Sequence, residues 1–316
     1  MKVYFAPLEG MTDEVFRRAH HDCFGGVDKY FIPFVSPTQN LVLTNKEQRA
    51  VSPVENAGVP VVPQILAKDA GHFLWVTKEL ADMGHTEVNL NMGCPSGTVT
   101  AKGKGSGLLR DLDALTAFLD EIFTHSPLPV SLKTRIGFES PDEWPAILSL
   151  LSRYPVHELI IHPRTRSQFY KGEVCMEAYA QAMSLPYPVV YNGDLFTVED
   201  CKKLSTAYPQ TSALMLGRGL LANPALAQEL VGGDALTAAA LRSFHDRVFR
   251  AYQERYQENV VLGRMRELMN HMACCFADPH KPLKAIRKAK TASAYLDAAN
   301  MLFDLPLCDD PHYMHL

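Results

Sequence analysis

Short apolar, β-branched runs alternate with helix-like stretches through the first two thirds of the chain. Eight such runs occupy residues 3–7, 30–35, 61–66, 87–93, 129–135, 158–164, 188–194 and 212–218. The helix-like stretches between them include residues 69–83, 111–124, 142–154 and 198–208. Because strands that alternate with helices form parallel βα units, eight of them predict an α/β fold, the closed (β/α)8 or TIM barrel.

An open, doubly wound sheet is the alternative for the same alternation. That fold favours a Gly-rich turn after its first strand, whereas this chain continues with Pro7-Leu8-Glu9-Gly10. Beyond residues 231–234, a Val-Gly-Gly-Asp linker, no convincing strand follows. Residues 236–299 instead predict about four helices, with breaks near Asn259 and Asp278-Pro279. We therefore expect a barrel over residues 1–233 and a small all-helical C-terminal domain over 234–316.

Composition narrows the class of protein further. No apolar run approaches the ~20 residues that cross a bilayer, and the N-terminus reaches Pro7 before a signal-peptide core could form. Seven cysteines at irregular spacing favour a reducing cytoplasm over a disulfide framework. The net charge of −4 excludes a protein that is basic all over, but not a local basic patch. We expect a cytoplasmic monomer with no membrane partner.

Polar residues gather at the C-terminal ends of the predicted strands, where barrel active sites lie. Because side chains alternate along a strand, Asn89 and Asn91 share one face, and the next run places Lys133 and Arg135 on one face. We expect these faces to point into the barrel. The third run carries Gln64 among apolar residues, and later runs end at His162, Asn192-Gly193-Asp194 and Gly217-Arg218.

Basic groups that converge on one barrel mouth repel one another unless an anion joins them. The loops after strands seven and eight are the usual phosphate site of this fold. There Gly193 and Gly217 permit close backbone approach, and Arg218 supplies a charged fork. A phosphorylated flavin fits these residues, and the spacing alone equally allows a sugar phosphate.

Cys94 lies between Gly93 and Pro95 in the loop after the fourth run. A free Cys is usually buried and inert, but its position at the catalytic end favours a chemical role. The Gly-rich, basic residues 97–107 do not match a P-loop, because Gly rather than Ser or Thr follows Lys104. We expect a mobile lid there.

A metal site is a further hypothesis, suggested by His271, Cys274, Cys275 and His280. Vicinal cysteines do not match the usual paired ligand spacing. We therefore expect these residues to be helix core, with no metal bound.

Six ordered segments resemble the tRNA-dihydrouridine synthases of bacterial type, flavoenzymes that reduce uridine in tRNA. The segments are APLEGMTD (6–13), NLNMGCPSGTVTAKGKGSGLL (89–109), SLKTRIG (131–137), HPRTRSQFYKG (162–172), YNGDLF (191–196) and LGRGLLANP (216–224). The resemblance runs through the whole barrel and more weakly into the tail. Two positions depart from the family pattern: Pro163 stands where Gly is usual, and Gly97 where Lys or Arg is usual.

The resemblance implies FMN as cofactor, NADPH or NADH as reductant, and tRNA as partner. It implies Cys94 as the proton donor, and Asn91, Arg135 and Arg164 near the target uridine. The implied FMN contacts are Pro7, Leu8, Glu9, Gln64, Lys133, His162, Asn192, Gly193, Asp194, Gly217 and Arg218.

The chemistry explains these residue types. Reduction of the uracil C5–C6 bond needs a hydride at C6, which reduced FMN carries, and a proton at C5. A thiol is mostly protonated at pH 7, so Cys94 can serve as the general acid. A flavin barrel acting on a free pyrimidine, as dihydroorotate dehydrogenases do, and a non-catalytic tRNA-binding protein are the alternatives.

The tail carries a basic helix-like segment, residues 281–290, with five basic residues and no acid. At helical spacing Lys281, Lys284 and Lys288 fall on one stripe, with Arg287 alongside, while Ile286 belongs to an apolar stripe. In an acidic chain such a concentration is unexpected. Together with the resemblance, it predicts that Lys284, Arg287 and Lys288 contact tRNA phosphates.

Overall fold

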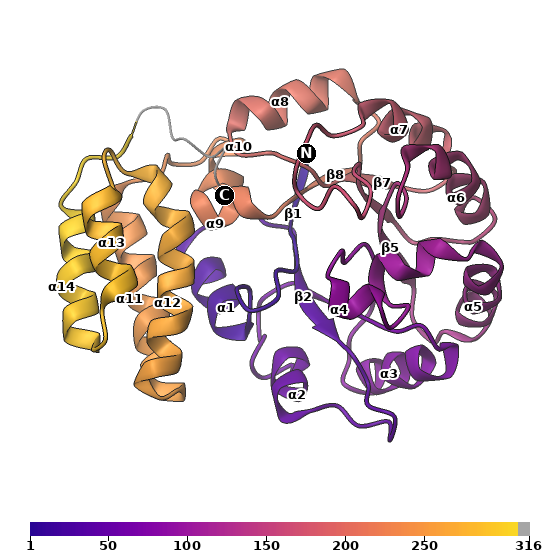
Figure 1. The fold of residues 1–316 in the computed structure, drawn as a ribbon, viewed down its shortest axis with the longest axis horizontal. Coiled ribbons are helices and arrows are strands. Elements are labelled where there is room, and N and C mark those ends of the chain that lie inside the picture. The colour runs from indigo at the N-terminus through magenta and orange to yellow at the C-terminus, as the bar shows by residue number, and fades with distance from the viewer. Residues whose placement is uncertain (309–316) are drawn as a thin grey trace. The chain divides into compact units, whose positions relative to one another are not determined.

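The computed structural model describes residues 1–308, and a closed barrel of eight parallel strands dominates it (Figure 1). The strands follow one another around the barrel in chain order. They are β1 (Lys2–Phe5), β2 (Lys29–Val35), β3 (Val61–Ile65), β4 (Val88–Met92), β5 (Val130–Arg135), β6 (Leu159–His162), β7 (Val189–Tyr191) and β8 (Ala213–Leu216). The predicted TIM barrel with C-terminal helices is confirmed.

The chain divides into two compact units. The first comprises residues 1–7, 29–193 and 204–215, and therefore holds most of the barrel. Its helices are α2 (Asn45–Val51), α3 (Ala70–Asp82), α4 (Gly97–Thr100), α5 (Leu112–His125), α6 (Trp144–Leu151) and α7 (Met176–Gln181), with the 3-10 segments η1 (Gly105–Arg110), η2 (Pro141–Glu143) and η3 (Ala182–Ser184). Helix α8 (Val198–Ala207) has residues in both units.

The second unit comprises residues 8–28, 194–203 and 216–316. Its helices are α1 (Glu14–Cys23), α9 (Arg218–Ala222), α10 (Leu226–Leu230), α11 (Ala238–Arg255), α12 (Glu258–Met272), α13 (His280–Lys288) and α14 (Ala292–Phe303), with the 3-10 segment η4 (Ala273–Cys275). Thus loop segments from the barrel part of the sequence join the tail in this unit. The functional division at residue 233 stays a prediction.

The interior of the barrel is filled by a cluster of apolar side chains. The cluster contains Tyr4, Ala6, Phe31, Val62, Ile160, Val190, Ala213 and Met215. Alternate residues of the same strands continue inward toward the C-terminal ends, where they become polar. A filled interior leaves chemistry to the C-terminal mouth.

A charged network lies at the opposite end of the barrel, where the strands begin. Lys29 Nζ lies 2.6 Å from Glu87 Oε2 and 3.0 Å from Glu158 Oε1. The Tyr4 hydroxyl donates to Glu158 Oε2 at 2.9 Å, and His157 Nε2 lies 3.7 Å from Glu87 Oε2. Burial, and then the charge of Glu87, raises the pKa of Glu158. Pattern reading gave no sign of this network, because its members come from four distant segments.

In the second unit, α1 packs against α11. Asp13 caps α1 by accepting from the Phe16 N–H at 3.0 Å, and the Phe16 ring meets Phe244 of α11 edge to face with centroids 5.4 Å apart. Between the linker and residue 308, the structure has four helices, α11–α14, as expected. The first break lies at residues 256–257 rather than at Asn259, which is inside α12, and the second lies at residues 276–279.

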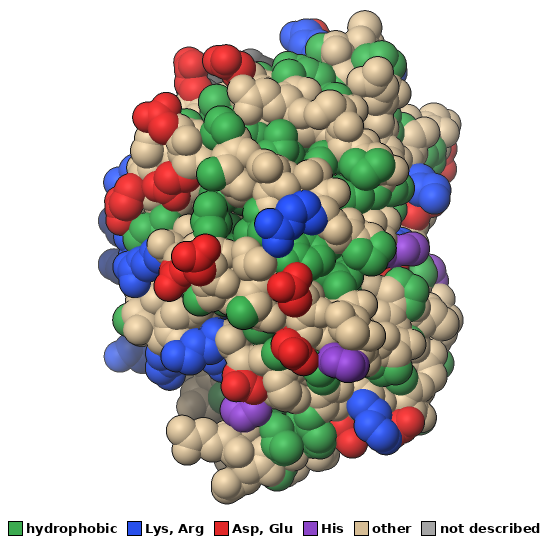
Figure 2. Space-filling model, turned by 90° about the vertical axis from the view of Figure 1, so that its right-hand side faces the viewer, with side chains coloured by type: hydrophobic (Ala, Val, Ile, Leu, Met, Phe, Trp, Pro, Cys, Tyr) green, Lys and Arg blue, Asp and Glu red, His purple; other side chains and the backbone are tan. Residues whose placement is uncertain are grey.

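The outer surface over α5 and α6 carries mixed charge. Figure 2 shows this side of the barrel, with acidic, basic and apolar side chains interspersed. Such mixing is ordinary for solvent-exposed helix faces. The chemistry of the barrel therefore has to be sought at its mouth rather than on this face.

Candidate active site

The loop that carries Cys94 is held by hydrogen bonds on both sides of its peptide groups. Asn91 Oδ1 accepts from the Gly93 N–H at 3.1 Å and from the Cys94 N–H at 2.9 Å. Arg135 Nε donates to the Gly93 carbonyl at 2.9 Å. The Cys94 carbonyl accepts from the Ser106 N–H and hydroxyl, at 3.1 Å and 2.8 Å. The half-buried thiol is therefore presented at the barrel mouth from a fixed backbone.

The Gly-rich segment after Cys94 packs against this loop, and its expected mobility as a lid stays a prediction. Residues 97–100 form α4 and residues 105–110 form η1. Gly105 has φ +59, and a Cβ there would lie 2.9 Å from the Cys94 carbonyl oxygen. Only glycine fits this position without strain. Sequence reasoning missed both Gly105 and Ser106; the "GSG" triplet was the available signal.

A chain of buried amides joins β3, β4 and β5 beneath the loop. Gln64 Nε2 donates to Asn89 Oδ1 at 2.7 Å, and Asn91 Nδ2 donates to Gln64 Oε1 at 2.7 Å. Asn89 Nδ2 donates to the Ser131 hydroxyl at 3.0 Å. The predicted inward face of these strands is thus present, with its polar groups paired. Contacts of Gln64 with a cofactor and of Asn91 with uridine stay predictions.

Lys133 is a polar group of this mouth that lacks a partner among residues 1–308. Its ammonium makes no hydrogen bond or ion pair with the residues of 1–308, and its strand neighbour in the register is Asn91. Burial, followed by the charge of Arg135, lowers the pKa of Lys133 to about 7. A buried amine beside a guanidinium, without a carboxylate, is a place where an anionic ligand is stabilised.

Arg135 and Arg164 anchor the loop after β6. They are only 2 % and 1 % exposed. Arg135 Nη1 donates to the carbonyls of Thr165 and Phe169, at 2.8 Å and 2.7 Å. Arg164 Nη2 donates to the Gly172 carbonyl at 2.6 Å. Both guanidiniums therefore hold loop backbone, and the role near uridine that the resemblance implies remains a prediction for each.

Polar residues at the ends of β6 and β7 also contact other residues of the first unit. His162 Nε2 lies 3.2 Å from Arg164 Nη1. Asn192 Nδ2 donates to the Met215 carbonyl at 2.9 Å and so ties the end of β7 to β8. A Cβ on Gly193 would lie 2.3 Å from the Tyr191 hydroxyl oxygen, so a larger residue would displace that ring.

Five of the predicted cofactor residues lie in the second unit, namely Leu8, Glu9, Asp194, Gly217 and Arg218. Pro7 is the last residue of the first segment of the barrel unit. Leu8 and Glu9 open a turn in which the Leu8 carbonyl accepts from the Met11 N–H at 3.0 Å. Gly217 precedes α9, whose first residue, Arg218, pairs with Asp194 at 2.8 Å. The predicted phosphate fork is thus ion-paired and 20 % exposed.

Helix α13 has the two faces that the spacing predicts. Ile286 is fully buried. Lys281, Lys284 and Lys288 are exposed, and so is Arg287, although its Nε donates to Asn270 Oδ1 at 2.7 Å. The exposed basic stripe is present, and its contact with tRNA stays a prediction.

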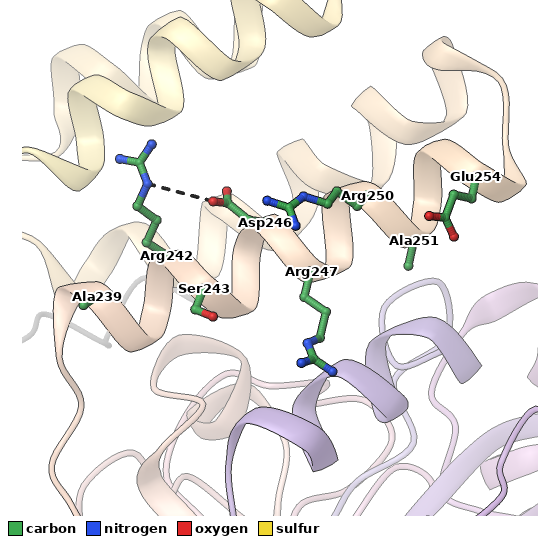
Figure 3. A pocket seen from close by; sticks show the side chains of 8 residues that line it. All are labelled: Ala239, Arg242, Ser243, Asp246, Arg247, Arg250, Ala251 and Glu254. Atoms are coloured by element: carbon green, nitrogen blue, oxygen red, sulfur yellow. Dashed lines mark ion pairs between the residues drawn. The ribbon is translucent and has the colours of Figure 1, made fainter.

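A second row of arginines lines a groove along α11 (Figure 3). Arg242 lies 3.9 Å from Asp246, and Arg247 lies 2.7 Å from Asp22 of α1. Figure 3 shows Arg250 on the other side of Asp246. Because acidic groups accompany these arginines, the groove offers less free positive charge than α13.

Within residues 1–308, no group of three or more His, Cys, Asp or Glu side chains is arranged to hold a metal ion. Of the metal candidates, Cys275 donates its thiol to the Ala222 carbonyl at 3.0 Å, and Cys274 donates to the His271 carbonyl at 2.9 Å. No helix in the same part of the chain is both long enough and apolar enough to span a membrane.

Comparison with known proteins places this thiol-bearing parallel barrel in a family. The family model for dihydrouridine synthases matches residues 4–302. The chain belongs to the dihydrouridine synthase family. The expectation from the six motifs is confirmed at this level.

Individual relatives agree with the family model. The chain is 28 % identical to the tRNA-dihydrouridine(16) synthase of Pseudomonas putida, with 84 % of this chain and 86 % of that protein covered. It is 30 % identical to probable tRNA-dihydrouridine synthase 2 of Bacillus subtilis, with 69 % of each chain covered. Among solved structures, morphinone reductase matches with a TM-score of 0.53 at 10 % identity, over 77 % of this chain and 88 % of that one. This last likeness concerns the fold alone.

Proposed function

We propose that this chain is a tRNA-dihydrouridine synthase that reduces the C5–C6 bond of a D-loop uridine. The family membership and the names of the relatives support the reaction. The observation that carries it here is Cys94, whose backbone is held at the barrel mouth by Asn91 and Ser106. Residues 1–233 act as the catalytic barrel and 234–316 as the tRNA-binding part, in the cytoplasm.

The cofactor in this proposal is FMN, reduced by NADPH or NADH. Lys133 supports an anionic cofactor, because it has no partner within residues 1–308 and its pKa is lowered to about 7. When bound and reduced, FMN supplies the hydride equivalent that uracil C6 requires. The residues that would hold it are Pro7, Leu8, Glu9, Gln64, Lys133, His162, Asn192, Gly193, Asp194, Gly217 and Arg218.

Cys94 acts as the general acid in this account. Its thiol holds the proton that C5 receives, and the paired backbone of its loop fixes the direction of transfer. The thiolate left behind attracts the Lys133 ammonium, because the Cys94 charge raises the pKa of that amine against the effects of burial and Arg135. Since Cys94 is half-buried, solvent can restore its proton.

The two alternatives are less well supported. A flavin barrel for free pyrimidines needs no exposed basic stripe such as that of α13. A non-catalytic tRNA-binding protein needs neither a clamped thiol nor a buried amine without a counter-ion. The proposed reaction accounts for both the Cys94 site of the barrel and the basic stripe of α13.

Dihydrouridine mapping in cells tests this function. In a strain that lacks the gene, digestion and mass spectrometry of tRNA should show one D-loop position that has lost dihydrouridine. The wild-type gene should restore it and a Cys94→Ala gene should not. An unchanged dihydrouridine map in the deletion strain would contradict the proposal, and the position that changes identifies the target uridine.

A further inference from the structure

The loop after β6 exposes an aromatic ring on strained backbone. Phe169 has φ +52, a left-handed conformation unfavourable for a bulky residue. Its side chain is nevertheless 41 % exposed. Two hydrogen bonds enforce this geometry: the Phe169 N–H donates to the Arg166 carbonyl at 3.1 Å, and the buried Arg135 donates to the Phe169 carbonyl at 2.7 Å. Local backbone preference therefore does not explain a phenylalanine at this position.

A column of alternating cations and rings stands behind Phe169. The Arg166 guanidinium carbon lies 5.3 Å from the Phe169 ring centroid and 5.1 Å from that of Phe138. Arg110 covers Phe138 at 4.0 Å. We call these four residues the rim column. Phe138 is only 4 % exposed, so Phe169 is the ring that the column offers to a ligand.

The cation in the middle of the rim column has unused hydrogen-bonding capacity. Arg166 Nε is buried and has no hydrogen-bond partner within residues 1–308. A guanidinium over a ring adds positive charge beside it. An exposed ring beside a guanidinium matches a nucleotide, whose base stacks on the ring and whose phosphate the positive charge attracts.

The rim column also lies at the catalytic end of the barrel, where the strands end. Its members follow β4, β5 and β6, so they belong to the same mouth as Cys94. Tyr170, next to Phe169, is 49 % exposed, with its ring centroid 5.6 Å from the Arg135 guanidinium carbon. Phe169 and Tyr170 are consecutive exposed rings, and two rings are much smaller than the apolar patches that bind folded proteins.

We propose that Phe169, backed by Arg166, stacks on an unpaired RNA base that neighbours the target uridine. The inference rests on the proposed function, because it takes RNA as the substrate, and it adds the residue that grips the adjacent nucleotide. A uridine that enters the barrel mouth leaves its own stack, and a base held on Phe169 compensates for part of that loss.

The test compares Phe169→Gly, Phe169→Trp and wild type for binding of an unmodified tRNA transcript. Glycine adopts φ +52 freely, so Phe169→Gly should melt no lower than wild type. Its Kd and its KM for tRNA should nevertheless rise by about 5- to 100-fold, the usual effect of losing one stacked base. Phe169→Trp should keep wild-type affinity, and its added indole fluorescence should be quenched by tRNA.

Val54→Gly is the matched control. Val54 is 82 % exposed and lies between α2 and β3, at the opposite end of the barrel, so tRNA affinity should not change. If wild type forms dihydrouridine while Phe169→Gly binds tRNA as tightly, the stacking role is overturned and the proposed function stands. If wild type forms none, the proposed function fails and the inference fails with it.

Discussion

At the residue scale, the barrel mouth combines paired polar groups with a lysine, Lys133, that has no partner within residues 1–308. Asn91, Arg135 and Ser106 each hydrogen-bond the backbone of the loop that carries Cys94. The Lys133 ammonium makes no hydrogen bond or ion pair within residues 1–308, and burial and Arg135 lower its pKa to about 7. A directed proton transfer requires a fixed geometry around the thiol and a charged group beside it, here Lys133.

The lowered pKa of Lys133 predicts a pH dependence of cofactor binding. In free protein this amine loses its proton above about pH 7, whereas an anionic cofactor favours the charged form. Binding above that pH therefore takes up a proton, and FMN affinity should fall by up to about tenfold per pH unit between about pH 7 and pH 9. Fluorescence titration of flavin-stripped protein measures this slope. Lys133→Met should abolish the slope, and an equal slope in that variant would rule out Lys133 as its source.

At the element scale, the strands are positioned by interactions at both ends of the barrel. The mouth has its amide chain, and the opposite end has the network of Lys29, Glu87 and Glu158. Which side chains of β4 and β5 share a face was predictable, because side chains alternate strictly along a strand. The fold of residues 97–110 was not, because Gly105 and Ser106 are placed by contacts with Cys94 rather than by local propensity.

Lys29→Met tests the charged network. Removal of the amine leaves two buried carboxylates without a cation, and should lower the free energy of unfolding by about 3 kcal/mol at pH 7. The pKa of Glu158 is already raised, so the folded state binds a proton more tightly than the unfolded state. The deficit should therefore shrink as the pH falls toward about 5.

Chemical denaturation at both pH values measures the effect. Lys78→Met is the control, because Lys78 makes an exposed i,i+4 pair with Asp82 on the barrel surface. That variant should leave the free energy of unfolding nearly unchanged. A Lys29→Met deficit that grows on acidification would contradict the assignment.

At the scale of the whole molecule, the order of strands and helices could be predicted from the sequence. The division of the segments between the two compact units could not. The eight strands and four tail helices follow from periodicity. The membership of residues 8–28 and 194–203 in the second unit depends on packing between segments far apart in the chain, for example α1 on α11, which periodicity does not encode. Phe169 was overlooked for a similar reason, since a positive φ and an exposed ring become visible only in three dimensions.

The basic stripe of α13 makes a prediction at this scale. Lys284→Glu combined with Lys288→Glu should weaken tRNA binding and flatten its salt dependence by about two phosphate contacts. Filter binding over a range of salt concentrations gives both quantities. Charge reversal of Lys78 and Lys203, two exposed lysines in local ion pairs, is the matched control. An unchanged salt slope in the α13 variant would show that the stripe does not meet RNA.

The central claim is that this chain reduces uridine in tRNA with Cys94 as the proton donor, and single-turnover transfer tests it most directly. Protein reduced beforehand by NADPH is mixed with unmodified tRNA, and dihydrouridine is followed by mass spectrometry. Wild type should convert one uridine per flavin. Cys94→Ala should retain its flavin but convert uridine about 10²–10⁴-fold more slowly, the usual loss for a missing general acid. Equal rates in the two proteins would contradict the account.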